Sequence, residues 1–165
     1  MTTDRIESLE PLIASGCRIL ILGSMPGVKS IEKKEYYANP GNQFRKLVFA
    51  VFGKPFDTSY EAFVRLLAEQ KIGLWNVIRY CRRKGSADHN ISEAIPNDLG
   101  ALLAQYPKID YIFFESLSAQ KFHDRLCTRH PGITYGILPS TSGLNARMSF
   151  DQKLEKWEIL RTILS

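Results

Sequence analysis

The fold is decided by the stretch Cys17-Arg18-Ile19-Leu20-Ile21-Leu22-Gly23-Ser24-Met25-Pro26-Gly27, in which an apolar run ends abruptly in a loop of small residues. The run predicts a buried strand, and the loop follows directly after it. A second apolar run, Ile133–Ile137, leads in the same way into Leu138-Pro139-Ser140-Thr141-Ser142-Gly143-Leu144-Asn145. Ligands bind at the carboxyl ends of strands in open α/β sheets, and glycine lets backbone approach a ligand closely. We therefore expect these two loops to meet around one substrate.

The remaining hydrophobic patterns predict strands that alternate with helices. Strands are expected at residues 18–22, 72–78, 110–114 and 134–138. Helices are expected at residues 5–14, 43–52, 59–70, 96–106, 116–129 and 151–164. This alternation predicts an α/β protein with three layers, α/β/α, around a central, mainly parallel four-stranded sheet. No repeat or linker divides the chain, so a single domain is expected over residues 1–165.

Two further segments carry polar or basic residues. The segment from Gly23 to Asn42 is expected to be a long loop, and loops of that length in compact domains are usually functional. The run Arg79-Tyr80-Cys81-Arg82-Arg83-Lys84-Gly85-Ser86 is the most concentrated basic stretch. Its two interpretations, a solvated loop or a contact to phosphate groups, stay open at this point.

Composition excludes several classes of protein. No apolar run approaches the roughly 20 residues of a membrane span, and the first residues do not resemble a secretory signal, so a cytoplasmic protein is expected. Three widely spaced cysteines and three scattered histidines predict no disulfide framework, no iron–sulfur cluster and no zinc site. The net charge of +5 permits a polyanionic partner without requiring one.

Three segments together resemble the motifs of one family. They are Gly23-Ser24-Met25-Pro26-Gly27, the stretch Tyr36–Phe44 (YYANPGNQF) and the stretch Ser140–Arg147 (STSGLNAR). In this order they resemble the uracil-DNA glycosylase superfamily, most of all its hypoxanthine-DNA glycosylase branch and next its mismatch-specific uracil/thymine branch. The resemblance implies a base-excision repair enzyme that hydrolyses the N-glycosidic bond of a deaminated base flipped out of DNA. It implies no metal or redox cofactor, and no motif position holds a lysine for lyase chemistry.

The resemblance also assigns roles around the flipped base. Tyr37 is the expected aromatic platform, with Tyr36 as the alternative, and Asn76 is expected to read the edge of the base. Asn42 is the expected catalytic residue, which positions the attacking water; its competing interpretation is a helix cap. The loop residues Gly23, Ser24 and Met25 are expected to line the base. Met25 departs from the family's usual polar residue, and Asn76 departs from the Asp that is frequent in the hypoxanthine branch.

The third segment is expected to face DNA. The resemblance implies that Ser142 contacts a phosphate and that Gly143 and Leu144 form a wedge at the vacated base step. Arg147 is expected at a phosphate or the opposite strand, and Ser140 stands where other members place His or Asn. Asn145 completes this set of expected DNA-binding residues. The competing interpretation of the whole segment is an ordinary turn.

Two rival functions remain open from the sequence alone. One is a nucleic-acid binder without catalysis, which the missing polar residue at Met25 favours. The other is hydrolysis or transfer on a free nucleoside or nucleotide, for which no wedge is needed. The sequence does not rank hypoxanthine, uracil and xanthine, and it does not decide between single-stranded and double-stranded DNA. No obligate protein partner and no membrane are implied.

Overall fold

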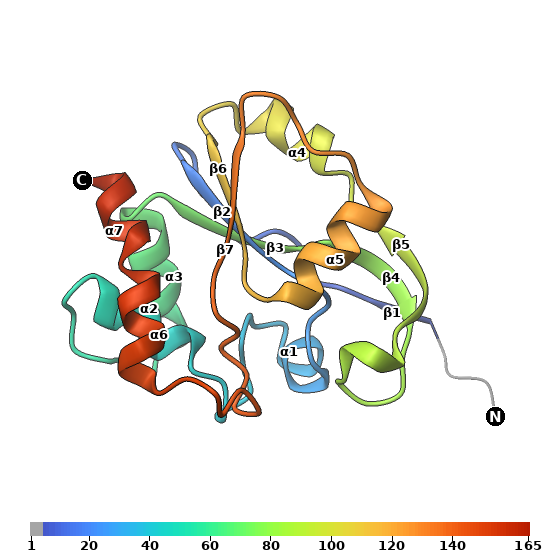
Figure 1. The fold of residues 1–165 in the computed structure, drawn as a ribbon, viewed down its shortest axis with the longest axis horizontal. Helices are drawn as coiled ribbons and strands as arrows, with labels where there is room; N and C mark the ends of the chain where they lie inside the picture. The colour runs from blue at the N-terminus through green and yellow to red at the C-terminus, as the bar shows by residue number, and fades with distance from the viewer. Residues whose placement is uncertain (1–4) are drawn as a thin grey trace.

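The computed structural model describes residues 5–165 as a central sheet between helices, with a smaller sheet beside it (Figure 1). The strands are β1 (Arg5–Glu7), β2 (Ile19–Gly23), β3 (Ile72–Asn76), β4 (Ile78–Arg82), β5 (Ser92–Pro96), β6 (Tyr111–Phe114) and β7 (Thr134–Ile137). The α-helices are α1 (Val28–Lys33), α2 (Phe44–Val51), α3 (Tyr60–Glu69), α4 (Leu99–Gln105), α5 (Leu117–Leu126), α6 (Phe150–Trp157) and α7 (Ile159–Leu164). A 3₁₀ turn, η1, spans Asp88–Asn90.

The central sheet has the strand order β3-β2-β6-β7, and all its neighbouring strands are parallel. Every residue of β2 is buried, as expected for a strand that is covered on both faces. The register pairs Gly23 with Asn76 and Leu22 with Phe114. The carboxyl ends of β2, β3 and β6 therefore lie side by side, which is the arrangement that makes a ligand site possible.

Two layers of helices cover the two faces of this sheet (Figure 1). Ile19 and Ile21 pack into one hydrophobic cluster with residues of α2, α3, α6 and α7. Leu20 and Leu22 point to the other face and pack with residues of α4 and α5. The alternation follows from the period of two in a strand. The expected three-layer α/β/α fold with a parallel four-stranded sheet is confirmed.

The smaller sheet was not predicted. It is antiparallel with the order β1-β4-β5. The expected strand over residues 72–78 instead divides at Val77, whose amide donates to the carbonyl of Gly23 and whose carbonyl accepts from Asn97. After Val77 the chain changes partners and continues as β4. Residues 79–82 of the basic run are therefore in a strand, and the interpretation of the whole run as a solvated loop is wrong.

Three other predicted elements also need correction. The helix expected at residues 5–14 is wrong, because its first residues form β1 and Leu12 forms a bridge with Leu74. The loop expected from Gly23 to Asn42 contains α1. The closing helix is divided at Glu158 into α6 and α7. Among residues 5–165, no helix has both the length and the apolar character needed to cross a membrane.

Candidate active site

Side chains from three separate segments converge on Gly23, the last residue of β2. A Cβ atom placed on Gly23 would lie 3.0 Å from Nδ2 of Asn76, 3.4 Å from the hydroxyl oxygen of Tyr37 and 3.7 Å from Oε1 of Glu115. A side chain at this position would thus force these groups to shift, and glycine lets them approach the end of β2 closely. We call Gly23, Tyr37, Asn76, Glu115 and the neighbouring Thr141 the carboxyl-edge cluster. The structure brings together three predicted site residues with two that the sequence analysis missed.

Asn76 is held with its amide inside the protein. Asn76 is only 4% exposed, and its main-chain carbonyl accepts a hydrogen bond from Nδ2 of Asn97 at 2.8 Å. The side-chain Oδ1 is buried without a hydrogen-bond partner. A buried amide oxygen without a partner costs stability, because it has lost water without gaining a replacement. Asn76 therefore offers an unused acceptor to a ligand, beside the donor on Nδ2.

Tyr37 presents an aromatic ring at the cluster. Its backbone has a φ of 54°, and its ring stacks on that of Phe44 with centroids 3.7 Å apart and planes 4° from parallel. Burial, followed by the negative charge of Glu115, raises the pKa of its phenol well above the ordinary value, so the ring is neutral. Tyr36 has a structural task instead, since it is buried and its hydroxyl donates to the carbonyl of Glu10 at 2.7 Å.

Glu115 directly follows β6, the strand between β2 and β7. Burial raises the pKa of its carboxyl to about 8, and the nearby Asp88 contributes in the same direction, whereas Thr141 acts in the opposite one. Its Oε2 is buried without a hydrogen-bond partner. A signal was present in the sequence, because a carboxylate at the end of a predicted buried strand is unusual. Its relation to the two loops could not be read without the strand order.

The loop after β2 is hydrogen-bonded to the side chain of Asp88. The hydroxyl of Ser24 donates to Oδ2 of Asp88 at 2.7 Å, and the hydroxyl of Ser118 donates to the same oxygen at 2.6 Å. The side chain of Met25 is buried, with 6% exposed, among apolar residues between the sheet and α4. A thioether is at most a weak hydrogen-bond acceptor, so the side chain of Met25 cannot take the place of the family's usual polar residue.

Asn42 lies two residues before α2 (Phe44–Val51), whose N-cap residue is Gln43, and its side chain accepts from the first amide of the helix. Its side-chain Oδ1 accepts a hydrogen bond from the backbone amide of Phe44 at 2.8 Å. The backbone amide of Asn42 donates to the carbonyl of Asn39 at 2.9 Å. Asn42 is therefore not the N-cap residue considered from the sequence, although it satisfies one free amide at the start of the helix. An amide oxygen has two lone pairs, so the hydrogen bond to Phe44 leaves one acceptor site and both Nδ2 donors for another partner. This hydrogen bond also fixes the side chain in one orientation.

The two loops expected to flank a ligand are joined through the segment that holds Asn42. The amide of Gln43 donates to the carbonyl of Thr141 at 2.9 Å. A Cβ atom on Gly143 would lie 2.7 Å from the carbonyl oxygen of Gly41, so the two backbones touch. Thr141 in turn lies beside Glu115. A continuous set of contacts therefore links the end of β2 through Glu115 to the loop after β7.

The loop after β7 is held by its own hydrogen bonds. Oγ of Ser140 accepts from the amide of Ser142, and Oγ of Ser142 accepts from the amide of Leu144. Nδ2 of Asn145 donates to the carbonyl of Ser140 at 3.0 Å. These contacts present Leu144 to solvent with 94% of its surface exposed, and Arg147 is exposed in the same loop. Packing inside the protein does not explain why a large apolar side chain stands almost fully exposed on this turn.

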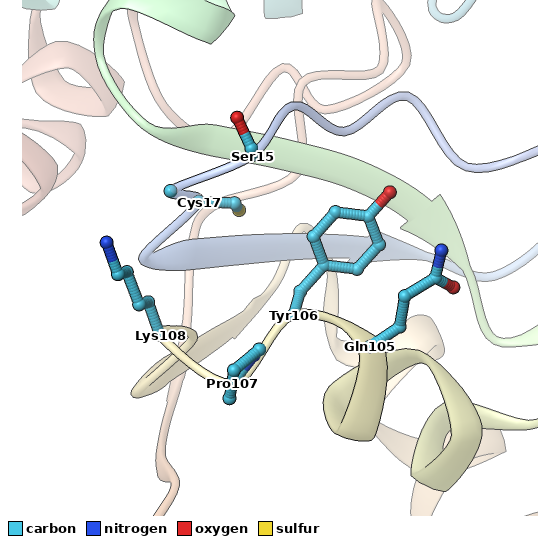
Figure 2. A pocket seen from close by; sticks show the side chains of 7 residues that line it. Ser15, Cys17, Gln105, Tyr106, Pro107 and Lys108 are labelled. Atoms are coloured by element: carbon cyan, nitrogen blue, oxygen red, sulfur yellow. The ribbon is translucent and has the colours of Figure 1, made fainter.

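A separate pocket of about 270 Å³ lies at the opposite, amino-terminal edge of the sheet (Figure 2). It is lined by the segment before β2 and the segment after α4, with Cys17 and Tyr106 among its residues. Burial raises the pKa of the Cys17 thiol to about 12, which leaves it unreactive at neutral pH. Among residues 5–165 no three His, Cys, Asp or Glu side chains form a group that could hold a metal ion. The convergent polar groups make the carboxyl-edge cluster the better candidate site.

Comparison with known proteins identifies the family of the chain. The family model described as the uracil DNA glycosylase superfamily matches residues 11–163. A curated protein named hypoxanthine DNA glycosylase from Methanosarcina acetivorans is 40% identical over 141 residues, which is 85% of this chain and 87% of that protein. One of the same name from Methanosarcina barkeri is 33% identical over 142 residues, 86% of this chain and 89% of that protein.

Solved structures give the same relationship. The solution NMR structure of a candidate uracil DNA glycosylase from Methanosarcina acetivorans superposes with a TM-score of 0.84 and 34% sequence identity. The match covers 98% of this chain and 100% of that one. The similarity therefore extends over both the sheet and the loops at its carboxyl edge.

Proposed function

Because the chain belongs to the uracil DNA glycosylase superfamily, we propose that it is a monofunctional DNA glycosylase whose active site is the carboxyl-edge cluster together with Asn42. Its substrate is DNA that contains a deaminated base, with hypoxanthine as the first candidate and uracil as the second. The observation that carries this proposal is the buried amide of Asn76, which lies against Gly23 with an acceptor oxygen that has no partner.

The unpaired amide of Asn76 suits the edge of a deaminated base. Hypoxanthine and uracil each present a ring N–H next to a carbonyl. Oδ1 of Asn76 can accept from the N–H while Nδ2 donates to the carbonyl. The amide can also rotate, so adenine could form the opposite pair of hydrogen bonds. Asn76 alone therefore supports recognition of a base edge without excluding every normal base.

Stacking supports the position of the base. A glycosylase reaches the N-glycosidic bond only after the nucleotide is extruded from the helix, which costs a few kcal/mol in unstacking. The ring of Tyr37 is backed by Phe44 at 3.7 Å, so it is a rigid surface for a flipped base. Offset stacking of the base on this ring recovers part of the stacking free energy that was lost when the base left the helix.

Hydrolysis needs a water molecule at the sugar carbon C1′. We assign its orientation to Asn42, whose cap on Phe44 fixes the side chain and leaves an acceptor lone pair for the water. The water oxygen forms the new bond to C1′, the bond from C1′ to the base nitrogen breaks, and the base leaves with the electron pair. The water gives up a proton to solvent and the departing base takes one up. The products are the free base and an abasic site.

The loop after β7 is proposed to hold the DNA. Leu144, 94% exposed, is suited to fill the gap left by the extruded nucleotide. Ser140, Ser142, Asn145 and Arg147 share this loop and are proposed to contact the DNA backbone beside the gap. Such contacts position the duplex without reading its sequence.

An excision assay tests the proposal. Wild-type protein in excess is incubated with oligonucleotides that each carry one hypoxanthine, uracil, xanthine, adenine or thymine, as single strands and as duplexes. We expect abasic sites from hypoxanthine or uracil and none from adenine or thymine. Binding to every oligonucleotide without excision of any modified base would contradict the proposal and favour a non-catalytic binder.

A further inference from the structure

Glu115 occupies the position between the two loops that flank the site. It follows β6, and β6 lies between β2, which ends at Gly23, and β7, which leads into the loop that contains Thr141. Oε1 of Glu115 and Nδ2 of Asn76 approach the same point above Gly23 from the strands on either side of β2. A ligand edge that contacts Asn76 at this point also reaches Glu115.

The cluster contains two buried polar atoms without hydrogen-bond partners, Oδ1 of Asn76 and Oε2 of Glu115. The hydroxyl of Thr141 lies beside Glu115 and interacts with its carboxyl. Each such atom costs free energy unless a ligand or water satisfies it. Their gathering at one place is typical of a binding site, because the cost is recovered when a complementary polar molecule binds. Glu115 thus belongs to the ligand-contacting side of the cluster.

The protonation of Glu115 decides what it can offer. The groups that face it are the Asp88 carboxylate from η1, the neutral phenol of Tyr37 and the hydroxyl and backbone of Thr141. The hydroxyls of Ser24 and Ser118 hold Asp88 in place by hydrogen bonds. Arg83, the residue after β4, interacts electrostatically with Asp88. With a pKa raised to about 8, mainly by burial, the carboxyl of Glu115 is protonated at neutral pH. A protonated carboxyl is a hydrogen-bond donor.

We propose that Glu115 is a further catalytic residue, which donates a hydrogen bond to the 6-carbonyl oxygen of a flipped hypoxanthine, beside the donor on Asn76. This role rests on the proposed glycosylase function. A carbonyl oxygen accepts from both donors at once. The 6-amino group of adenine presents only N–H groups, so it could pair with Glu115 only through the accepting oxygen of the carboxyl and would leave the O–H donor unused.

The same hydrogen bond assists departure of the base. As the N-glycosidic bond breaks, the electron pair that stays with the base delocalises onto its carbonyl oxygen. A donor aimed at that oxygen stabilises the negative charge as it develops and so lowers the barrier. When Glu115 ionises, the donor is lost and a negative charge faces the leaving group. Excision of hypoxanthine must therefore slow as the pH rises through the pKa of this carboxyl.

The test compares pH profiles of single-turnover hypoxanthine excision, from about pH 6 to about pH 10, for wild type, Glu115→Gln and Glu115→Ala. The matched control is Glu69→Gln, an exposed glutamate on α3. We expect wild type and E69Q to lose about tenfold or more in rate above about pH 8. E115Q keeps a neutral N–H donor, so its rate should fall clearly less than that of wild type over the same range, and only through ionisation of the hypoxanthine N1–H. E115A should be slow at every pH, with folding checked by circular dichroism.

The outcomes separate this role from the proposed function. An alkaline loss of rate in E115Q equal to that in wild type overturns the role of Glu115, as does wild-type activity in folded E115A at neutral pH. Absence of excision by wild type at every pH overturns the glycosylase proposal and the role of Glu115 with it.

Discussion

Asn42 has one structural role and one proposed catalytic role, which a substitution can separate. Its Oδ1 caps the amide of Phe44 in the structure, and we propose that the same side chain orients the attacking water. Loss of a cap costs about 1 kcal/mol of stability, whereas loss of a water-positioning group costs about 100-fold or more in rate. Measurement of both quantities on one variant therefore shows whether Asn42 is only structural.

We predict that Asn42→Ala lowers the excision rate about 100-fold or more while the protein still binds DNA. The rate is measured under single-turnover conditions, and binding by fluorescence anisotropy. Asn39→Ala is the matched control, because Oδ1 of Asn39 also accepts a backbone hydrogen bond, from Gly41, but in an exposed turn. Equal rates for both variants would assign Asn42 to capping alone.

Glu115 also carries a prediction about stability. The pKa of its carboxyl is raised from 4.5 to about 8 in the folded protein. As the pH rises from 4.5 to 8, the unfolded chain ionises while the folded protein keeps the proton, so the free energy of unfolding falls over this range. Glutamine cannot ionise. Glu115→Gln should therefore be more stable than wild type at pH 8, by roughly 2–4 kcal/mol, with little difference near pH 4.

Urea unfolding at several pH values measures this difference, with Glu69→Gln as the control on an exposed glutamate. A gain in E115Q that does not change with pH would mean that the carboxyl of Glu115 ionises in the folded protein as it does in the unfolded chain.

At the scale of elements, the contact between two loops sets the geometry of the site. Gly143 and Gly41 have backbones so close that a Cβ atom on Gly143 would lie 2.7 Å from a carbonyl oxygen. We predict that Gly143→Ala pushes the loop after β7 away from Asn42 and lowers the excision rate about tenfold or more. Gly41→Ala is the control, since its Cβ would meet only a side-chain oxygen at 3.5 Å. Unchanged activity in G143A would show that the loop contact does not matter for catalysis.

Leu144 tests whether this loop acts as a wedge. We predict that Leu144→Ala slows excision from duplex DNA about tenfold, because the extruded base is no longer replaced in the stack, and that excision from single strands changes little. Thermal unfolding should be unaffected, since Leu144 is 94% exposed. Equal losses on single strands and duplexes would contradict a wedge.

The strands of the central sheet could be predicted because each is a short apolar run that leads into a turn. The smaller sheet could not, since Arg79 and Arg82 interrupt the apolar character of β4 and its partner β5 holds Pro96. The N-terminal helix was wrong because Ile6, Leu9, Leu12 and Ile13 have helical spacing, yet their side chains pack on the sheet from an extended segment.

The candidate site was predictable only in part, because some of its residues come together only through the order of the strands in the sheet. Motifs in the sequence indicated Gly23, Tyr37 and Asn76, and the structure brings these three together. Glu115 and Thr141 join them through the strand order β2-β6-β7, which spacing along the chain does not determine. Buried polar atoms without partners are likewise visible only once the fold is known.

At the scale of the whole molecule, a net charge of +5 predicts that DNA binding weakens with salt. If Arg147 contacts a phosphate, Arg147→Ala should reduce the slope of log affinity against log salt by about 1. Anisotropy titrations at several salt concentrations measure this slope. Arg65→Ala on α3 is the control, because Arg65 is exposed on a helix that packs beside β3, away from the loop after β7.

We propose that the carboxyl-edge cluster and Asn42 together release a deaminated base from DNA by hydrolysis. The most direct measurement quantifies both products from a duplex with one hypoxanthine: the free base by mass spectrometry and the abasic site by alkaline cleavage. We predict one free hypoxanthine for each abasic site, with the strand intact until alkali is added. Release of hypoxanthine from the free nucleoside but not from DNA, or DNA binding without any free base, would contradict the account.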